Sequence, residues 1–400
     1  MMKTTNCLKM LCIGLSCLSL ASAQDNRKPF LMPLDFKNFG TTKRNWFHPG
    51  VAVLPDGTWL ATMQEIAGSD FYCNPHFAFS HDKGQTWTTP QEIESYKATP
   101  FKDTNYQIGV ADVRPFVSPN DGTAFVFSCT VFYSPKGNTA WEKGEKPDFP
   151  PEQGFYVTWR PETGWSKRKV LPLPEYKGNY RTACTQIAFT GNNEVLVPIY
   201  LERGKTKFGS FDSDRYGIVV GRYRQVGEEL EYISMSHYID HETGRGAIEP
   251  SIVQLPEGGF ALTIRAEDNH GYVCCSKDGM TWSDKLFWRW EDGTPLTMSS
   301  TQQHWLRVGG KVYLVYTRDD GDNTKIFRFR APLYIAEAIP SKGVLLRETE
   351  QVAIPRQLID GQEALYGNFH CTQLTPFTGL VVDSGETAKQ CKVMATLVTP

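Results

Sequence analysis

Short apolar segments recur along the chain, and each is followed by a polar turn and a second apolar segment. Residues 48–63 contain two such segments on either side of a Pro-Asp-Gly turn at 55–57. Residues 249–264 repeat the arrangement around a Pro-Glu-Gly turn at 256–258. Two apolar runs joined by a tight turn that contains proline and glycine predict an antiparallel β-hairpin.

Four further segments have the same shape, so the pattern predicts six hairpins. They are residues 114–127, 185–199, 301–317 and 368–382. Their starts lie roughly 50 to 70 residues apart, a spacing typical of β-propeller blades. Aromatic residues make up 12% of the chain, which also favours an all-β fold. We therefore predict a β-propeller in which the residues between the hairpins supply the outer strands.

Two related motifs follow the hairpins at 48–63 and 249–264. Residues 80–87 read Ser-x-Asp-x-Gly-x-Thr-Trp, and residues 276–282 match a version that is one residue shorter. These motifs resemble the Asp-boxes of sialidase-like propellers. The aspartate can accept backbone N–H groups in a tight turn, and the tryptophan can cover apolar surface between blades. We expect the motifs to be structural, at the turn between the third and fourth strands of a blade.

The first 23 residues are typical of an export signal. Lysines precede an apolar run at residues 10–20, and small residues at 21–23 form a cleavage site. The run is too short to span a bilayer. We expect residues 24–400 to form a single domain that is periplasmic or secreted. A buried N-terminal helix and a lipid anchor at Cys17 are less favoured alternatives.

The formal net charge is -2, and the sequence shows no basic cluster. We therefore expect neither nucleic-acid binding nor membrane insertion. Seven cysteines follow the predicted signal, and none forms a pair with zinc spacing. Cys129, Cys184 and Cys371 lie in apolar strand patterns, which indicates small buried side chains, although one or two disulfides remain open. No metal or cofactor is expected.

The inner strands of a propeller converge on its axis, so the residues that begin these strands ring a common pocket. When the hairpins are aligned on their turns, one residue of each takes this position. These residues are His48, Arg114, Thr182, Glu249, Thr301 and Asn368. Polar residues at the start of apolar strands, repeated around a ring, favour a functional site over packing alone.

Each candidate has a chemical role that suits its side chain. Histidine titrates near neutral pH, so His48 is the candidate general base or acid. Arg114 and Arg181 are candidates for binding a carboxylate. Further candidates for substrate binding are Asn45, Trp46, Glu249, Gln303, His304 and His370. A metal site at His304 and His370 is less favoured, because strand alternation turns about half of these side chains away from any one pocket.

Sialidases carry an Arg-Ile-Pro motif in the first blade, whereas residues 45–50 here read Asn-Trp-Phe-His-Pro-Gly. With the predicted signal, the two motifs and the chain length, this segment resembles glycoside hydrolase family 145 over essentially the whole mature chain. The resemblance implies a seven-bladed, sialidase-like propeller with His48 as the catalytic residue. It also implies an α-L-rhamnosidase that removes terminal rhamnose linked α-1,4 to glucuronic acid in arabinogalactan side chains.

The seven blades implied by the resemblance exceed the six hairpins in the sequence. A seventh blade would lie in residues 216–238 or 327–354. Alternatively, strands near 30–36 and 393–398 close one blade from both ends of the chain. The implied partner is an acidic plant-type oligosaccharide, and we expect a monomer.

Two other functions stay open. A polysaccharide lyase acting on the same rhamnose–glucuronate linkage would use His48 to remove the acidic C5 proton of the uronate while an arginine stabilises the developing charge. A propeller that binds glycans without cleaving them is the other alternative. The lyase product would absorb in the near ultraviolet, whereas the hydrolase product would not.

Overall fold

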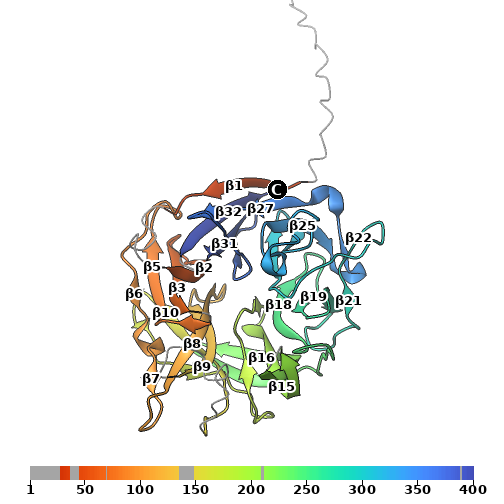
Figure 1. Ribbon diagram of the computed structural model, residues 1–400. Helices are drawn as coiled ribbons and strands as arrows, with labels where there is room; N and C mark the ends of the chain where they lie inside the picture. The colour runs from red at the N-terminus through yellow and green to blue at the C-terminus, as the bar shows by residue number, and fades with distance from the viewer. Residues whose placement is uncertain (1–27, 37–44, 69, 135–147, 209–210, 388–389) are drawn as a thin grey trace, which may run out of the picture.

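The computed structural model is a ring of six β-sheet blades around a central axis (Figure 1). Two short strands, β28 (Leu358–Ile359) and β29 (Gln362–Glu363), pair outside the blades. The predicted export signal lies outside the described residues. The structure describes residues 28–36, 45–68, 70–134, 148–208, 211–387 and 390–400.

Each blade is a sheet that runs from the axis to the rim. Neighbouring strands pair antiparallel, except two short strands of the fifth blade, Arg289–Trp290 and Val344–Leu345, which pair parallel. The inner strands are β2 (Trp46–Val53), β8 (Gln107–Val117), β13 (Tyr180–Arg181) with β14 (Ala188–Phe189), β18 (Ile248–Gln254), β23 (His304–Val308) and β30 (His370–Thr375). The second strands are β3 (Trp59–Gly68), β9 (Ala124–Tyr133), β15 (Glu194–Phe208), β19 (Phe260–Arg265), β24 (Lys311–Tyr316) and β31 (Thr378–Glu386).

The outer half of each blade is less regular. The third strands are β5 (His76–Ser80), β10 (Gly154–Arg160), β16 (Phe211–Val226), β20 (Gly271–Ser276), β25 (Leu333–Ile339) and β32 (Cys391–Thr399). The remaining strands are β1 (Phe30–Leu34), β4 (Phe71–Tyr72), β6 (Gln91–Glu92), β7 (Thr99–Pro100), β11 (Gly164–Trp165), β12 (Lys169–Val170), β17 (Glu229–Met235), β21 (Leu286–Phe287), β22 (Arg289–Trp290), β26 (Val344–Leu345) and β27 (Gln351–Ile354). Short 3-10 turns span Glu94–Tyr96, Phe327–Phe329, Pro340–Lys342 and Arg347–Thr349.

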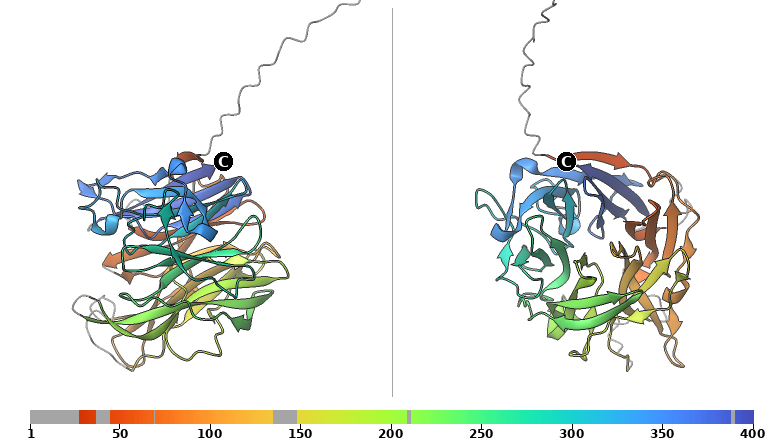
Figure 2. Two further views of the ribbon diagram at one scale, coloured as in Figure 1. Left: turned by 90° about the vertical axis from the view of Figure 1, so that its right-hand side faces the viewer. Right: turned by 180° about the vertical axis from the view of Figure 1, so that it is seen from behind.

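The sixth blade joins the two ends of the described chain. Strand β1 pairs with β32, from Phe30 opposite Thr399 to Leu34 opposite Ala395, and Figure 2 shows β1 beside the C-terminus. The prediction of seven blades is therefore wrong, and the hairpin count of six is correct. The stretches proposed for a seventh blade instead form β16 and β17 of the third blade and β25 to β27 of the fifth.

Apolar side chains fill the spaces between neighbouring blades. Between the first and sixth blades, Val51 and Ala61 pack with Leu380 and Val382, and all four are at most 1% exposed. Both faces of a sheet are buried in this way. In the fourth blade, Leu262 packs with the third blade and Ala261 with the fifth, because successive side chains of a strand point to opposite faces of the sheet. The core is thus a series of inter-blade clusters around the axis.

The turns at residues 80–87 and 276–282 follow the third strands β5 and β20. In the first turn, Asp82 accepts the backbone N–H of Thr86 at 2.8 Å. Gly84 has a φ of 85°, which favours glycine, and its carbonyl accepts the indole N–H of Trp87 at 3.1 Å. Asp278 accepts backbone N–H groups in the second turn. Both aspartates lie at the rim, away from the axis cavities.

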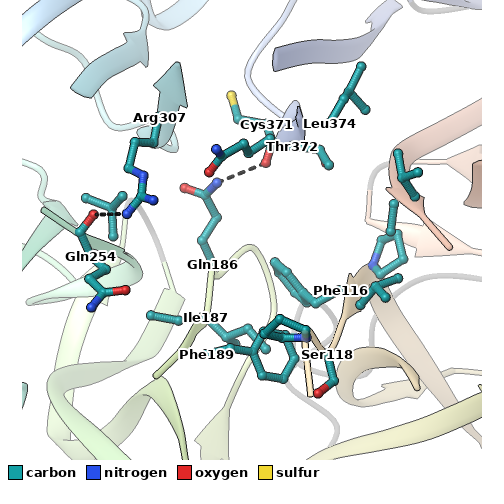
Figure 3. A pocket seen from close by; sticks show the side chains of 18 of the residues that line it. Phe116, Ser118, Gln186, Ile187, Phe189, Gln254, Arg307, Cys371, Thr372 and Leu374 are labelled. Carbon is teal, nitrogen blue, oxygen red and sulfur yellow. Dashed lines mark hydrogen bonds between the residues drawn. The ribbon is translucent and has the colours of Figure 1, made fainter. Parts of the chain in front are cut away.

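The axis is hollow at both of its ends. One cavity of about 990 Å³ lies where the inner strands begin, and we call it the N-face cavity. A second cavity of about 920 Å³ lies where they end, and we call it the C-face hollow (Figure 3). No helix among the described residues has the length and apolar character needed to cross a bilayer.

Candidate active site

Four inner-strand starts share an unusual backbone feature at the N-face cavity. His48, Asp112, Cys184 and Glu249 all have positive φ angles, between 46° and 58°. Three of them lie in β-bulges, where the register with the second strand shifts, and Cys184 lies in the break between β13 and β14. Left-handed backbone at non-glycine residues costs about 1–3 kcal/mol each and concentrates at functional sites. All four residues line the N-face cavity.

This feature corrects the alignment of the second blade. The bulge places Asp112, and not Arg114, at the position equivalent to His48. Arg114 lies two residues further along β8 and is fully buried. Its guanidinium contacts Asp112 at 2.6 Å and donates to the carbonyl oxygen of Phe369 at 2.9 Å. Arg114 therefore ties the second blade to the sixth and does not line the cavity.

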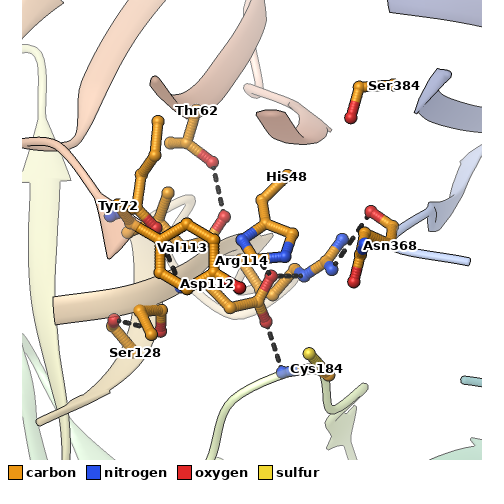
Figure 4. Close-up of polar contacts among 12 residues, drawn as sticks. His48, Thr62, Tyr72, Asp112, Val113, Arg114, Ser128, Cys184, Asn368 and Ser384 are labelled. Carbon is orange, nitrogen blue, oxygen red and sulfur yellow. Dashed lines mark hydrogen bonds and ion pairs between the residues drawn. The ribbon is translucent and has the colours of Figure 1, made fainter. Parts of the chain in front are cut away.

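His48 lies on the cavity wall beside Asp112 (Figure 4). Its Nδ1 is 3.7 Å from Asp112 Oδ1, which is longer than a hydrogen bond. Burial lowers the pKa of His48 to about 4, although the charge of Asp112 acts in the opposite direction. Burial opposes ionisation of Asp112, but Arg114 and His48 hold its pKa at about 2. At neutral pH the pair is therefore a neutral imidazole beside a carboxylate.

Two aromatic rings flank His48. Its ring centroid is 4.4 Å from that of Phe47 and 4.8 Å from that of Tyr72. The hydroxyl of Tyr72 donates to Asp70 at 2.9 Å, and burial raises the pKa of Tyr72 well above its usual value. Asp70 and Tyr72 lie in the connection between the second and third strands of the first blade. This connection places a phenol next to the imidazole in the cavity.

Two glutamates in the cavity are paired with arginines. Arg265 Nη1 contacts both carboxylate oxygens of Glu249, at 2.6 and 2.5 Å. Arg181 forms an ion pair with Glu152, and its guanidinium lies over the ring of Tyr216. These carboxylates hold the arginines in place, and both members of each pair line the cavity.

Arg330 differs from these arginines. It lines the cavity from the connection between β24 and β25, and it forms no ion pair with a carboxylate among the residues that the structure describes. Its Nε is buried and has no hydrogen-bond partner among the described residues. Burial and the neighbouring Arg265 lower the pKa of Arg330, and burial lowers that of Arg328 to about 10. Glu249 and Glu386 raise the pKa of Arg330 from a distance, but neither contacts its guanidinium, so an anionic ligand in the cavity could pair with Arg330 directly.

The predicted site residues fall into two groups. Asn45, His48, Arg181 and Glu249 line the N-face cavity. The others point elsewhere, and each has a packing or hydrogen-bonding role in the interior: these are Trp46 against His76, Arg114 with Asp112, Gln303 with Thr263 and Trp288, His304 between Ser251 and Gln302, and His370 beside Thr372.

The sequence reasoning missed several residues that line the cavity, among them Tyr72, Asp112, Cys184, Arg328 and Arg330. Asp112 had a detectable signal, since it is an acidic residue within the apolar segment 108–113. The residues that come from long connections had none. The described residues contain no cluster of three or more His, Cys, Asp or Glu side chains that could hold a metal.

Comparison with known proteins establishes the fold. The first similar structure is a protein of unknown function from Dyadobacter fermentans, with a TM-score of 0.63 and 16% identity, covering 93% of this chain and 98% of that one. The NanB sialidase of Streptococcus pneumoniae has a TM-score of 0.60 and 13% identity over 90% and 69% of the two chains. The intramolecular trans-sialidase of Ruminococcus gnavus has a TM-score of 0.57 and 15% identity over 88% and 94%.

These similarities define a sialidase-like β-propeller fold. No protein-family model matches the sequence, and no curated protein matches it. At 13 to 16% identity, the structural likeness describes the fold and leaves the chemistry to the residues of the cavity.

Proposed function

We propose that the chain is a glycoside hydrolase that acts on the end of an acidic glycan bound in the N-face cavity. The observation that carries this proposal is the neutral imidazole of His48 in the same cavity as Arg330, whose guanidinium forms no ion pair with a carboxylate of the described residues. An arginine in this state favours a carboxylate-bearing sugar. Solved sialidase-like propellers include the trans-sialidase of Ruminococcus gnavus in complex with oseltamivir carboxylate, which is consistent with such a ligand.

The pairing of two cavity carboxylates with arginines is consistent with a histidine mechanism. Most glycosidases use two carboxyl groups separated by roughly 5 to 10 Å, according to the stereochemistry of the reaction. Here Asp112 is paired with Arg114, and Glu249 is held by Arg265. Arg114 and His48 keep Asp112 ionised, and Arg265 contacts both carboxylate oxygens of Glu249, so neither group is placed to deliver a proton. His48 is neutral above about pH 4 and is suited to accept one.

The finer form of the proposal is cleavage of terminal L-rhamnose-α-1,4-D-glucuronic acid by an exported, monomeric enzyme. His48 accepts the proton of the rhamnose 2-hydroxyl as that oxygen attacks the anomeric carbon. The bond to the glucuronate oxygen breaks as that oxygen takes a proton from a water molecule beside the uronate carboxylate. The resulting hydroxide attacks the anomeric carbon and opens the strained ring, and the protonated His48 returns its proton to the 2-oxygen of rhamnose. Arg330 and Arg181 are placed to hold the uronate carboxylate.

A lyase on the same linkage is the second candidate, and the position of Tyr72 favours it. His48 and Tyr72 lie on one wall with ring centroids 4.8 Å apart, which provides a base and an acid on the same side of a sugar. His48 would remove the C5 proton of the uronate as the C4–O4 bond breaks. The departing oxygen would take the proton of Tyr72, and the products would be rhamnose and an unsaturated uronate.

One experiment distinguishes these functions. Purified protein is incubated with gum arabic, and the released sugar is identified while near-ultraviolet absorbance is recorded. Released rhamnose without a rise in absorbance supports hydrolysis, and release with a rise supports elimination. If no sugar is released but the glycan is bound, the protein is a binding propeller. Turnover of sialyl-lactose would contradict the proposed linkage and assign a sialidase activity.

A further inference from the structure

The C-face hollow is separate from the N-face cavity and has a different lining. It is formed by the last residues of the inner strands of all six blades. Its volume of about 920 Å³ is at the upper end of the range for small-ligand sites. Gln186 crosses the axis at its floor, where its amide donates to the carbonyl oxygens of Trp305 and Cys371 at 2.9 and 3.0 Å. A ligand here would not contact His48.

The walls of the hollow combine aromatic and polar groups. Figure 3 shows Phe116 and Phe189 on one side of Gln186, and Arg307 with Gln254 on the other. Both rings are half-buried, so part of each ring faces the hollow. Exposed amide side chains of Gln254 and Gln373 lie at its edge. Flat apolar rings beside amides are suited to the faces and hydroxyl groups of sugar rings.

Arg307 supplies the charge. It is half-buried, and its only described contact is a 3.4 Å hydrogen bond to the carbonyl oxygen of Gln254. It forms no ion pair with an acid among the described residues. The one acidic side chain of the hollow, Asp121, is paired with Arg160 and accepts a hydrogen bond from Gln225. A carboxylate in the hollow would therefore find a guanidinium that the described acidic side chains do not neutralise.

We propose that the C-face hollow is a second glycan-binding site, which holds a uronic-acid-containing segment of a polysaccharide with its carboxylate on Arg307 and a sugar face on Phe116 or Phe189. The site is independent of the chemistry at His48. Its role is to keep the protein on a polymer whose chain ends are processed at the opposite face. Two sites on one particle raise the effective concentration of chain ends at the N-face cavity.

The test measures binding alone, in a His48→Gln background so that turnover cannot change the probe. Mobility in native gels containing gum arabic gives the affinity, and carboxyl-reduced gum arabic is the matched probe without the charge. Arg307→Gln is expected to weaken binding to native gum arabic about tenfold, as expected for loss of a charge-assisted hydrogen bond. Phe189→Ala is expected to weaken binding to both probes. Arg289→Gln, a change at the rim, is the matched control and should bind like its parent.

Three results would overturn this proposal. The first is no retardation of the His48→Gln protein by gum arabic. The second is equal affinity of Arg307→Gln and its parent, in particular if Arg330→Gln alone abolishes binding, because the N-face cavity would then be the only site. The third is an effect of Arg307→Gln of the same size on the carboxyl-reduced probe. Failure of the proposed hydrolysis would leave all of these measurements unchanged.

Discussion

At the N-face, bulges in three of the inner strands turn His48, Asp112 and Glu249 toward the axis. At the C-face, the same strands end in regular alternation, and the lining is made of half-buried rings and amides such as Phe116 and Gln254. Regular strands give a smooth wall that can contact a ligand. Left-handed residues in bulges bring charged groups from separate blades together at one point. The comparison favours glycan cleavage in the N-face cavity and glycan binding in the C-face hollow.

The strongest way to break this comparison is to remove the imidazole. His48→Gln is expected to lower the rate of sugar release by about 10³-fold, because general base catalysis is lost. The far-ultraviolet circular dichroism and the unfolding midpoint should stay close to those of the wild type. If the His48→Gln protein is folded and has wild-type turnover, the N-face cavity is not the catalytic site.

A substitution at the rim tests whether the stability of the propeller can change without a change in activity. Trp87 is 8% exposed and lines neither cavity. Trp87→Ala is expected to lower the free energy of unfolding by about 3 kcal/mol through loss of buried contacts, with kcat/KM unchanged below the unfolding range. Chemical denaturation measures the first quantity and initial rates the second. Trp282→Ala, the counterpart in the fourth blade, should behave alike, and altered kcat/KM in both would couple the rim to the site.

The charge of the N-face can be tested at Arg330. Arg330→Gln is expected to raise KM about tenfold with little change in kcat, because it removes a contact to a carboxylate that is present before and during reaction. Initial rates on rhamnose–glucuronate oligosaccharides provide the measurement. With a carboxyl-reduced substrate, the variant and the wild type should not differ. An equal loss on both substrates would mean that Arg330 acts on structure and not on the carboxylate.

The last test is a difference in pH dependence. Burial lowers the pKa of His48 from 6.5 to about 4, so between these values the unfolded state binds a proton that the folded state does not. The free energy of unfolding therefore falls as the pH drops through this range, by up to about 1.4 kcal/mol per pH unit for one group. His48→Gln should show a shallower slope in urea denaturation over the same range.

Other buried groups do not obscure this difference. Burial lowers the pKa of His370 to about 3 and raises that of Asp383 to about 7, and these two groups have opposite effects on stability in acid. Both are present in the wild type and in the variant, so their contributions cancel in the comparison. Identical slopes in the two proteins would show that His48 is not buried as a neutral group.

The fold was accessible from the sequence because its signals are local. The turns at residues 55–57 and 256–258 fall between β2 and β3 and between β18 and β19, as the pattern predicts. The all-β, sialidase-like propeller is confirmed by the structure and by the solved relatives. The six hairpins counted in the sequence match the six blades, whereas the seven blades implied by the family resemblance are wrong.

The site was harder to predict from the sequence, because its residues are brought together by strand register and by long connections. Alignment of the hairpins on their turns paired His48 with Arg114, whereas the strand register pairs His48 with Asp112, two residues earlier. A bulge leaves no local mark in the sequence, so the turns alone could not show that Asp112, the acidic residue within the apolar segment 108–113, takes the position of His48. Arg330 lies in the connection between β24 and β25, where periodicity carries no information and only the closed ring brings the residue to the axis.

Strand β1 completes the sixth blade by pairing with β32, and this pair can open and close on a faster timescale than the whole propeller unfolds. Its partner β32 lies more than 360 positions away in the chain, so this pairing has the longest sequence separation in the ring and forms late in folding. Three of the five side chains of β1 are exposed, so little apolar contact opposes its detachment. Amide hydrogens of β32 that face β1 should therefore exchange with solvent sooner than those that face β31, long before the propeller unfolds as a whole.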